Sequence, residues 1–201
     1  MSASFDYSSF PLIDCRPPSS LIRSTDPILF KPDFPLSLSV SLALIIGRPG
    51  HNVSLAQSMS LVGAYSLALD FSTINNKDDN PPFIGISTSL SRPVAAAAID
   101  DPHRLRLWMQ INDTVVQDGS LLDTISTNTN NTSNVYYNSI PEVVSKLSHF
   151  SPLQPHDVII IRLNDNLLSQ VGHDHTVLAG AQIEGASKPV LTLQHQVQSV
   201  F

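Results

Sequence analysis

Ser37-Leu-Ser-Val-Ser-Leu-Ala-Leu-Ile-Ile-Gly47 is the stretch that decides the fold of this chain of 201 residues. Serine alternates with an apolar residue in its first half, and an uninterrupted apolar run follows up to Gly47. Successive side chains of a β-strand point to opposite faces, so a period of two predicts a strand with its serines on one face. From Val40 to Gly47 the composition indicates that this strand is buried.

Composition limits the class of protein around this strand. Hydrophobic residues make up 42% of the chain, which is enough for one sizeable core. Charged residues make up 14% and the net charge is −6, so a nucleic-acid-binding surface with clustered Lys and Arg is not expected. No run of eighteen apolar residues and no signal-peptide pattern is present, so no membrane insertion is expected. Cys15 is the single cysteine, which excludes an internal disulfide and favours a reducing compartment.

The remaining patterns predict mostly strands with a few short helices. Leu105 to Gln117 predicts a hairpin that turns at Asn112-Asp113. Helices are expected at 55–61, after a Ser54 N-cap, and from Ser139 onward. Further strands are expected at 26–31, 62–71, 157–161, 177–183 and 190–200. The fold class is therefore α+β, with β-structure dominant.

The domain organisation is expected to be simple. Residues 1–25 mix Ser, Pro and aromatic residues and predict an irregular N-terminal arm. Residues 26–201 are expected to form a single domain. Within it, the Thr- and Asn-rich stretch around 124–138 is of low complexity and predicts a solvent-exposed insertion.

Several of these segments, in this order and spacing, carry a family resemblance: 26–32, 39–47, 55–70, 99–112 and 140–159. Together they resemble the C-terminal domain of the fumarylacetoacetate hydrolase family, and most of all its small members of the acylpyruvase and oxaloacetate decarboxylase type. The resemblance implies a mixed β-roll, usually a homodimer. It also implies binding of Mg²⁺ or Mn²⁺ and action on β-dicarbonyl or 2-oxo acids.

The positions that bind metal in the family are largely changed in this chain. The family's strand reads Glu-x-Glu-Leu-Ala-x-x-Ile-Gly, whereas Ser39 and Ser41 occupy both glutamate positions here. Asp70 stands at the position of the family's metal-binding aspartate. Two neutral hydroxyls cannot replace two carboxylates beside a divalent ion, so the resemblance predicts at most a weak, residual Mg²⁺ or Mn²⁺ site at Asp70.

Other parts of the family's mechanism are also missing. Ile86 occupies the position of a lysine, and Lys77 in the preceding loop is a poor substitute. Residues 1–25 contain neither the His nor the Glu that the family places on its N-terminal lid. Of the family's Thr-Gly-Thr-Pro-x-Gly-Val-Gly loop, which follows the strand ending at Ile161, only Val171-Gly172 is kept. These combined losses predict a catalytically degenerate member, a pseudoenzyme without a cofactor that has a structural or partner-binding role.

Two alternatives stay open. One is a weakly active, divalent-metal-dependent hydrolase, decarboxylase or tautomerase acting on acylpyruvates or oxaloacetate. The other is a binding module that keeps the pocket without the ion. For each of them the resemblance predicts a homodimer or a subunit of a larger assembly, in mitochondria or in the cytoplasm.

Some residues allow a plainer interpretation as well. His173-Asp-His175 is either a metal-binding pair or an ordinary loop, and zinc would need further ligands. His103 is interpreted as a surface turn residue and Cys15 as unreactive. Asp70 could be a turn or capping carboxylate rather than a metal ligand.

Three residues at alternating positions are expected to lie on one face of the predicted hairpin. Arg104 and Arg106 are expected to face solvent, and Trp108 either covers this face or lies in a dimer interface.

Overall fold

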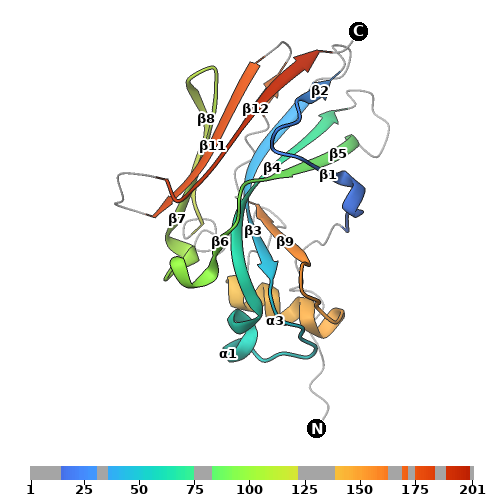
Figure 1. The fold of residues 1–201 in the computed structure, drawn as a ribbon, viewed down its shortest axis with the longest axis vertical. Coiled ribbons are helices and arrows are strands. Elements are labelled where there is room, and N and C mark those ends of the chain that lie inside the picture. Colours follow the sequence, from blue (N-terminus) through green and yellow to red (C-terminus); the bar gives the residue numbers. More distant parts are fainter. Residues whose placement is uncertain are drawn as a thin grey trace, which may run out of the picture.

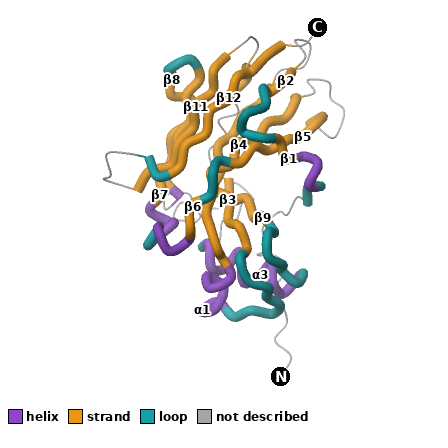
Figure 2. Tube along the Cα trace, viewed as in Figure 1, coloured by secondary structure: helices purple, strands orange, loops and turns teal. Residues whose placement is uncertain are grey.

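Two β-sheets form the body of the molecule in the computed structural model, with the α-helices α1 and α3 at one end (Figure 1, Figure 2). The structure describes residues 15–30, 36–74, 83–121, 139–162, 169–171, 175–183 and 189–199. In this part of the chain, strands predominate and helices are few and short. The predicted mostly-β fold class is therefore confirmed.

The larger sheet is built around the decisive strand. It comprises β1 (Leu21–Ile22), β5 (Phe83–Leu90), β4 (Val62–Ile74), β3 (Leu36–Ile46) and β10 (Ser169–Val171) in this spatial order. β9 (Val158–Arg162) also pairs with β3, and β6 (Val94–Ala95) with β4. β1 runs parallel to β5, and the other pairs are antiparallel.

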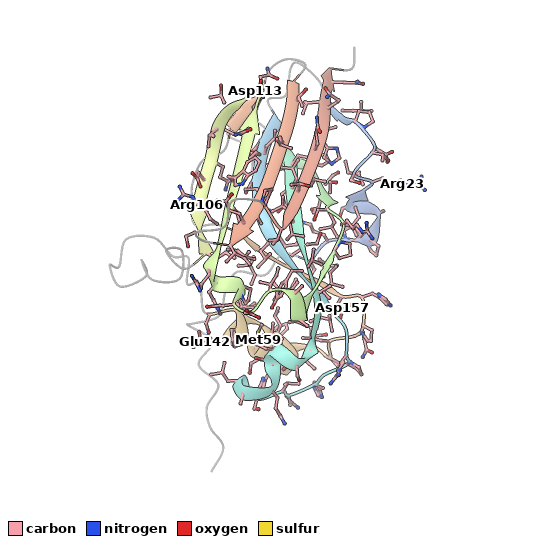
Figure 3. All side chains as sticks on the ribbon, turned by 60° about the vertical axis from the view of Figure 1, so that its left-hand side comes forward. Arg23, Met59, Arg106, Asp113, Glu142 and Asp157 are labelled. Atoms are coloured by element: carbon pink, nitrogen blue, oxygen red, sulfur yellow. The ribbon has the colours of Figure 1, made fainter. Side chains whose placement is uncertain are left out.

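The smaller sheet has the order β2 (Ile28–Phe30), β12 (Leu191–Ser199), β11 (His175–Ile183), β7 (Leu105–Ile111) and β8 (Thr114–Ser120). β2 is parallel to β12 and the rest is antiparallel, so the sheets are mixed. The predicted hairpin is confirmed as β7–β8, and it turns at Asn112 and Asp113, which both have positive φ. Asp113 lies at the tip of this hairpin (Figure 3).

The core lies between the two sheets, where side chains fill the space (Figure 3). β3 packs against β7, while β4 packs against β11 and β12. Leu38, Val40 and Leu42 on β3 are completely buried, as the alternation predicts. Their neighbours across the sheets are buried too: Leu44, Leu67, Leu69, Leu105, Leu107, Met109 and Val177.

Both predicted helices are confirmed, and they pack together at one end of the molecule. α1 (Leu55–Ser58) continues into a 3₁₀ turn (Met59–Leu61). α3 (Ile140–Phe150) begins after Ser139, whose N–H donates to the Glu142 carboxylate at 2.8 Å. Ser139 and Glu142 form a capping box, in which each side chain bonds the other residue's backbone N–H, and this explains why the helix begins directly after Ser139.

Arg104 and Arg106 are both exposed, as expected, but a 3₁₀ helix (Pro102–Arg104) precedes β7. Arg104 therefore does not share a strand face with Arg106. His103 is more than a surface turn residue, since its side chain is only 22% exposed and its Nε2 accepts a hydrogen bond from the Ile140 N–H at 3.2 Å. Trp108 lies over Gly180 on the neighbouring strand, where an added Cβ would come within 2.4 Å of the indole ring.

His195 connects the two sheets through the core. Its Nδ1 lies 2.9 Å from the Asp26 carbonyl oxygen, and its Nε2 lies 2.7 Å from the Ser89 hydroxyl. A carbonyl only accepts, so Nδ1 carries the proton, and Ser89 donates to Nε2 of a neutral imidazole. Burial lowers the pKa of His195 below its ordinary value, although the Asp26 carbonyl opposes this shift.

The lowered pKa predicts a dependence of stability on pH. Below about 6.5 the unfolded chain protonates its imidazole while the folded chain resists protonation, so the free energy of unfolding falls. The fall due to His195 has a slope of at most about 1.4 kcal/mol per pH unit and levels off below the folded-state pKa. Urea unfolding between pH 7.5 and about 5 should show a steeper decline for the wild type than for His195→Gln. Equal slopes would contradict this role.

Candidate functional site

Four strands, β5, β4, β3 and β9, bring the candidate residues onto one face of the larger sheet. Asp70 on β4 stands directly opposite Ser39 on β3 and Thr88 on β5. Ser41 stands opposite Arg162 on β9. Directly opposed residues point to the same face, so these side chains share the face turned away from the core between the sheets.

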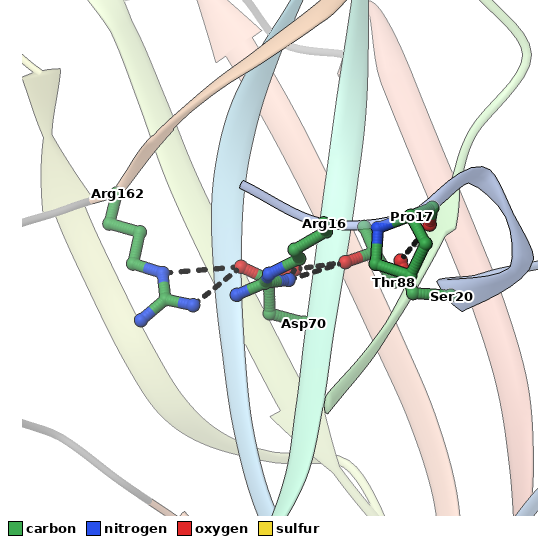
Figure 4. A network of polar contacts seen from close by, with 6 residues as sticks. All are labelled: Arg16, Pro17, Ser20, Asp70, Thr88 and Arg162. Carbon is green, nitrogen blue, oxygen red and sulfur yellow. Dashed lines mark hydrogen bonds and ion pairs between the residues drawn. The ribbon is translucent and has the colours of Figure 1, made fainter. Parts of the chain in front are cut away.

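The Asp70 carboxylate is held by two arginines and a threonine (Figure 4). Its Oδ1 accepts from Arg16 Nη1 at 2.7 Å and from Thr88 Oγ1 at 2.6 Å. Its Oδ2 lies 3.2 Å from both Nε and Nη2 of Arg162. Arg16 Nη1 also donates to Thr88 Oγ1 at 2.6 Å. We refer to these four residues as the Asp70 cluster.

Burial differs between the two ion pairs. The side chain of Asp70 is 5% exposed and that of Arg16 is 15% exposed, so this pair is largely removed from water. The side chain of Arg162 is 49% exposed, and its contacts are longer. The Asp70 cluster carries one negative and two positive charges, so its net charge is +1.

The structure places the sequence-predicted residues as follows. Ser39 is half-buried and faces Asp70, as the resemblance to the metal-binding strand implies. Ser41 is completely buried, and its Oγ has no hydrogen-bond partner within the described part of the chain. Ile86 lies on β5 opposite Ser72, but the structure does not describe its side chain. Lys77 and His173 lie outside the described residues. His175 begins β11, but its side chain is not described, so the His173-Asp-His175 prediction stays a prediction.

Asp70 is not a turn or capping carboxylate. β4 runs on to Ile74, so Asp70 lies inside the strand and not at its end. The sequence did not predict that Arg16 and Arg162 pair with Asp70. Arg16 is 54 residues away, in the predicted irregular arm, and no local pattern connects the two. For Arg162 a signal exists, because it stands where the family's oxyanion-binding loop should begin after Ile161.

The residues of the Asp70 cluster do not fit a divalent cation. Mg²⁺ and Mn²⁺ are held by oxygen ligands, chiefly carboxylates. Here a single carboxylate is already neutralised by guanidinium groups, and the facing serines carry no charge. Across the described residues, no group of three or more His, Cys, Asp and Glu side chains is placed to hold a metal ion.

Comparison with known proteins assigns the chain to a family. The family model described as fumarylacetoacetate (FAA) hydrolase C-terminal matches residues 2–161. The chain belongs to the fumarylacetoacetate hydrolase family. The family resemblance seen in the sequence is thereby confirmed.

Named relatives of this family member are enzymes. The mitochondrial oxaloacetate tautomerase FAHD1 of Pongo abelii is 29% identical over 163 residues, which cover 76% of this chain and 68% of the relative. The bifunctional 4-hydroxyphenylacetate degradation isomerase/decarboxylase of Escherichia coli is 27% identical over 162 residues, covering 74% of this chain and 33% of the relative.

Solved structures confirm the fold. The 5-carboxymethyl-2-hydroxymuconate delta-isomerase of Mycobacterium smegmatis superposes with a TM-score of 0.76 at 20% identity, covering all of this chain and 73% of that one. The maleylpyruvate hydrolase of Sphingobium sp. SYK-6, solved with manganese(II) and pyruvate, has a TM-score of 0.68 at 19% identity. It covers 90% of this chain, which spans 61% of the hydrolase. Among the described helices of this family member, none has the length and apolar character needed to cross a bilayer.

Proposed function

We propose that this protein is a catalytically degenerate member of the fumarylacetoacetate hydrolase family that does not use a divalent metal at Asp70 and serves a structural or partner-binding role. The observation that supports this proposal is the double ion pair of Asp70 with Arg16 and Arg162.

The physical argument concerns charge. A divalent cation at Asp70 would have to displace both guanidiniums or lie beside them, and like charges at such short range repel strongly in a partly buried site. The family resemblance places two further carboxylates on β3, and Ser39 and Ser41 provide none. A single carboxylate that is already paired with two guanidiniums therefore disfavours binding of a divalent cation.

A second candidate is a weakly active Mg²⁺- or Mn²⁺-dependent hydrolase, decarboxylase or tautomerase acting on oxaloacetate or acylpyruvates. The named relatives favour it, because they are enzymes and include an oxaloacetate tautomerase. Taken alone, the relatives support this candidate better than the first. It requires that Asp70 exchange its arginine partners for an ion, and this requirement is why we rank it second.

Turnover measurements separate the two candidates. The purified chain is incubated with oxaloacetate, or with acetylpyruvate, in the presence of Mg²⁺ or Mn²⁺, and the human oxaloacetate tautomerase FAHD1 serves as the positive control for oxaloacetate. We expect rates equal to the background of buffer and metal alone, for both the wild type and Asp70→Asn. Metal-dependent turnover above background that Asp70→Asn abolishes would contradict the proposal and establish the second candidate.

Partner binding is part of the same proposal. We propose that the chain forms a homodimer or joins a larger assembly, and that it resides in mitochondria or in the cytoplasm, the former being supported by the mitochondrial FAHD1 relatives. Light scattering of the purified 21.8-kDa chain tests the homodimer, because a mass of one chain would exclude it.

A further inference from the structure

The outer face of the smaller sheet, turned away from the core, carries uncharged polar side chains. On β12 the outward residues alternate with buried ones and are exposed: Thr192, Gln194, Gln196 and Gln198. The strand register places Gln110 on β7 and Gln182 on β11 on the same side. Among the outward side chains that the structure describes on this sheet, Arg106 and Asp118 alone are charged, and they pair with each other at 2.6 and 2.7 Å. This face therefore has no net charge.

The same face also presents apolar side chains. Leu29 on β2 is 56% exposed and Val115 on β8 is 52% exposed, at the two edges of the sheet. Leu178 lies half-buried on β11, the central strand of the five. Trp108 on the neighbouring strand lies over Gly180. Depletion of charge together with aromatic and apolar side chains is typical of the core of a protein–protein interface.

Charge and hydrogen bonding favour a second copy of this chain as the partner. The chain has a net charge of −6, so copies that approach each other repel. A face without net charge is where this repulsion is smallest. A glutamine side chain both donates and accepts hydrogen bonds, so a face rich in glutamine is complementary to itself across a twofold axis.

We propose that two copies of this chain associate through the outer faces of their smaller sheets, with Leu178 close to the twofold axis. The inference rests on the homodimer of the proposed function and names the surface that forms it. Leu178 is chosen for the axis because it lies on the central strand, between Gln110 on one side and Gln194 on the other. There it packs against its own copy, and the glutamines around it form hydrogen bonds across the interface.

The size of the face sets the strength expected of this dimer. Five strands about 4.8 Å apart, with the 7-residue length of β7, cover roughly 24 by 23 Å. Two such faces bury on the order of 1,100 Å², which is at the low end of specific interfaces. A polar interface of this size predicts a reversible dimer with a micromolar dissociation constant and not an obligate one.

Sedimentation equilibrium of the full chain over a wide range of concentrations tests the surface. We expect Leu178→Glu to raise the dissociation constant of the dimer about tenfold or more, because it sets two carboxylates opposite each other. Leu178→Lys should weaken the dimer in the same way. An equimolar mixture of the two variants should associate more tightly than either variant alone, since the charges then attract. Leu55→Glu, at an exposed leucine of α1 at the other end of the molecule, is the matched control and should leave the equilibrium unchanged (Figure 1).

Each contrary outcome has its own meaning. A dimer that Leu178→Glu leaves as stable as the wild type would overturn this surface and leave the proposed homodimer standing. The mass of a single chain at every concentration would overturn both. A mixture that associates no better than its components would overturn the position of Leu178 at the axis. Metal-dependent turnover would contradict the proposed loss of catalysis without affecting the dimer.

Circular dichroism shows whether the variants fold. If Leu178→Glu does not, Gln194→Lys takes its place, because Gln194 is exposed and its change leaves the core intact. It should weaken the dimer about threefold or more, since it brings an unpaired charge into the interface. An unchanged equilibrium in Gln194→Lys would overturn the surface equally.

Discussion

Asp70→Asn is expected to lower the free energy of unfolding by about 3 kcal/mol, since it breaks a buried ion pair. The change leaves the Arg16 guanidinium, which is 15% exposed, without its carboxylate, and it also weakens the contact to Thr88. Arg162 adds little to the loss because its half-exposed side chain can turn to water. Urea unfolding followed by circular dichroism measures the difference.

Asp118→Asn is the matched control for this change. Asp118 also pairs with an arginine, at 2.6 and 2.7 Å from Arg106, but both side chains are substantially exposed. The hydrogen bond from Arg106 lowers the pKa of Asp118, yet an exposed pair contributes less than about 1 kcal/mol. If Asp70→Asn costs no more than Asp118→Asn, Asp70 is not a structural ion-pair residue.

Gly47→Ala is expected to cost about 2–3 kcal/mol by overpacking. Gly47 ends the decisive strand and crosses Gly63 at close range, so an added Cβ would lie 2.8 Å from the Gly63 Cα and 3.2 Å from its N. These are backbone atoms, which cannot rotate away as a side chain does. Thermal or urea unfolding of the purified variant measures the loss.

Gly50→Ala provides the comparison for Gly47→Ala. Its Cβ would meet the Leu61 Cδ1 at 2.5 Å and the Val53 Cγ2 at 2.9 Å, which are side-chain atoms and not backbone. We expect a smaller loss of stability there, because side chains can shift more easily than backbone. Equal losses in the two variants would show that the close approach of Gly47 and Gly63 has no special role.

Much of the fold follows from local pattern. The alternation of serine and apolar residues predicts β3, Asn112-Asp113 predicts the β7–β8 turn, and Ser139 with Glu142 predicts the start of α3. All of these signals act over a few residues. The short strands β1, β6 and β10 could not be predicted in this way, because they exist only through pairing with β5, β4 and β3.

For the candidate site, the position of Ser39 beside Asp70 was predictable from the sequence, but the two arginines that pair with Asp70 were not. The family resemblance predicts that Ser39 and Asp70 belong to one site, and the strand register brings them face to face. The ion pair between Arg16 and Asp70 depends on how the arm packs onto the sheet, and Arg162 reaches Asp70 from a third strand. Contacts between segments this far apart leave no periodic trace in a single sequence.

In this family member, Arg16 and Arg162 pair with Asp70, the residue at which the resemblance implies a metal ligand. Its relatives are enzymes, and its fold is theirs. Packing constrains the residues of β3 up to Gly47, since Leu42 and Leu44 are buried in the core and Gly47 crosses Gly63. The opposite face of the strand is buried too at Ser41, but its side chains are polar and face the Asp70 cluster rather than the apolar core between the sheets.

Calorimetric titration of the purified, EDTA-dialysed chain with Mn²⁺ tests the proposed loss of the metal most directly. We predict no saturable heat in the micromolar range, because Asp70 is paired with Arg16 and Arg162. Binding of one Mn²⁺ per chain with micromolar affinity in the wild type, abolished in Asp70→Asn, would contradict it.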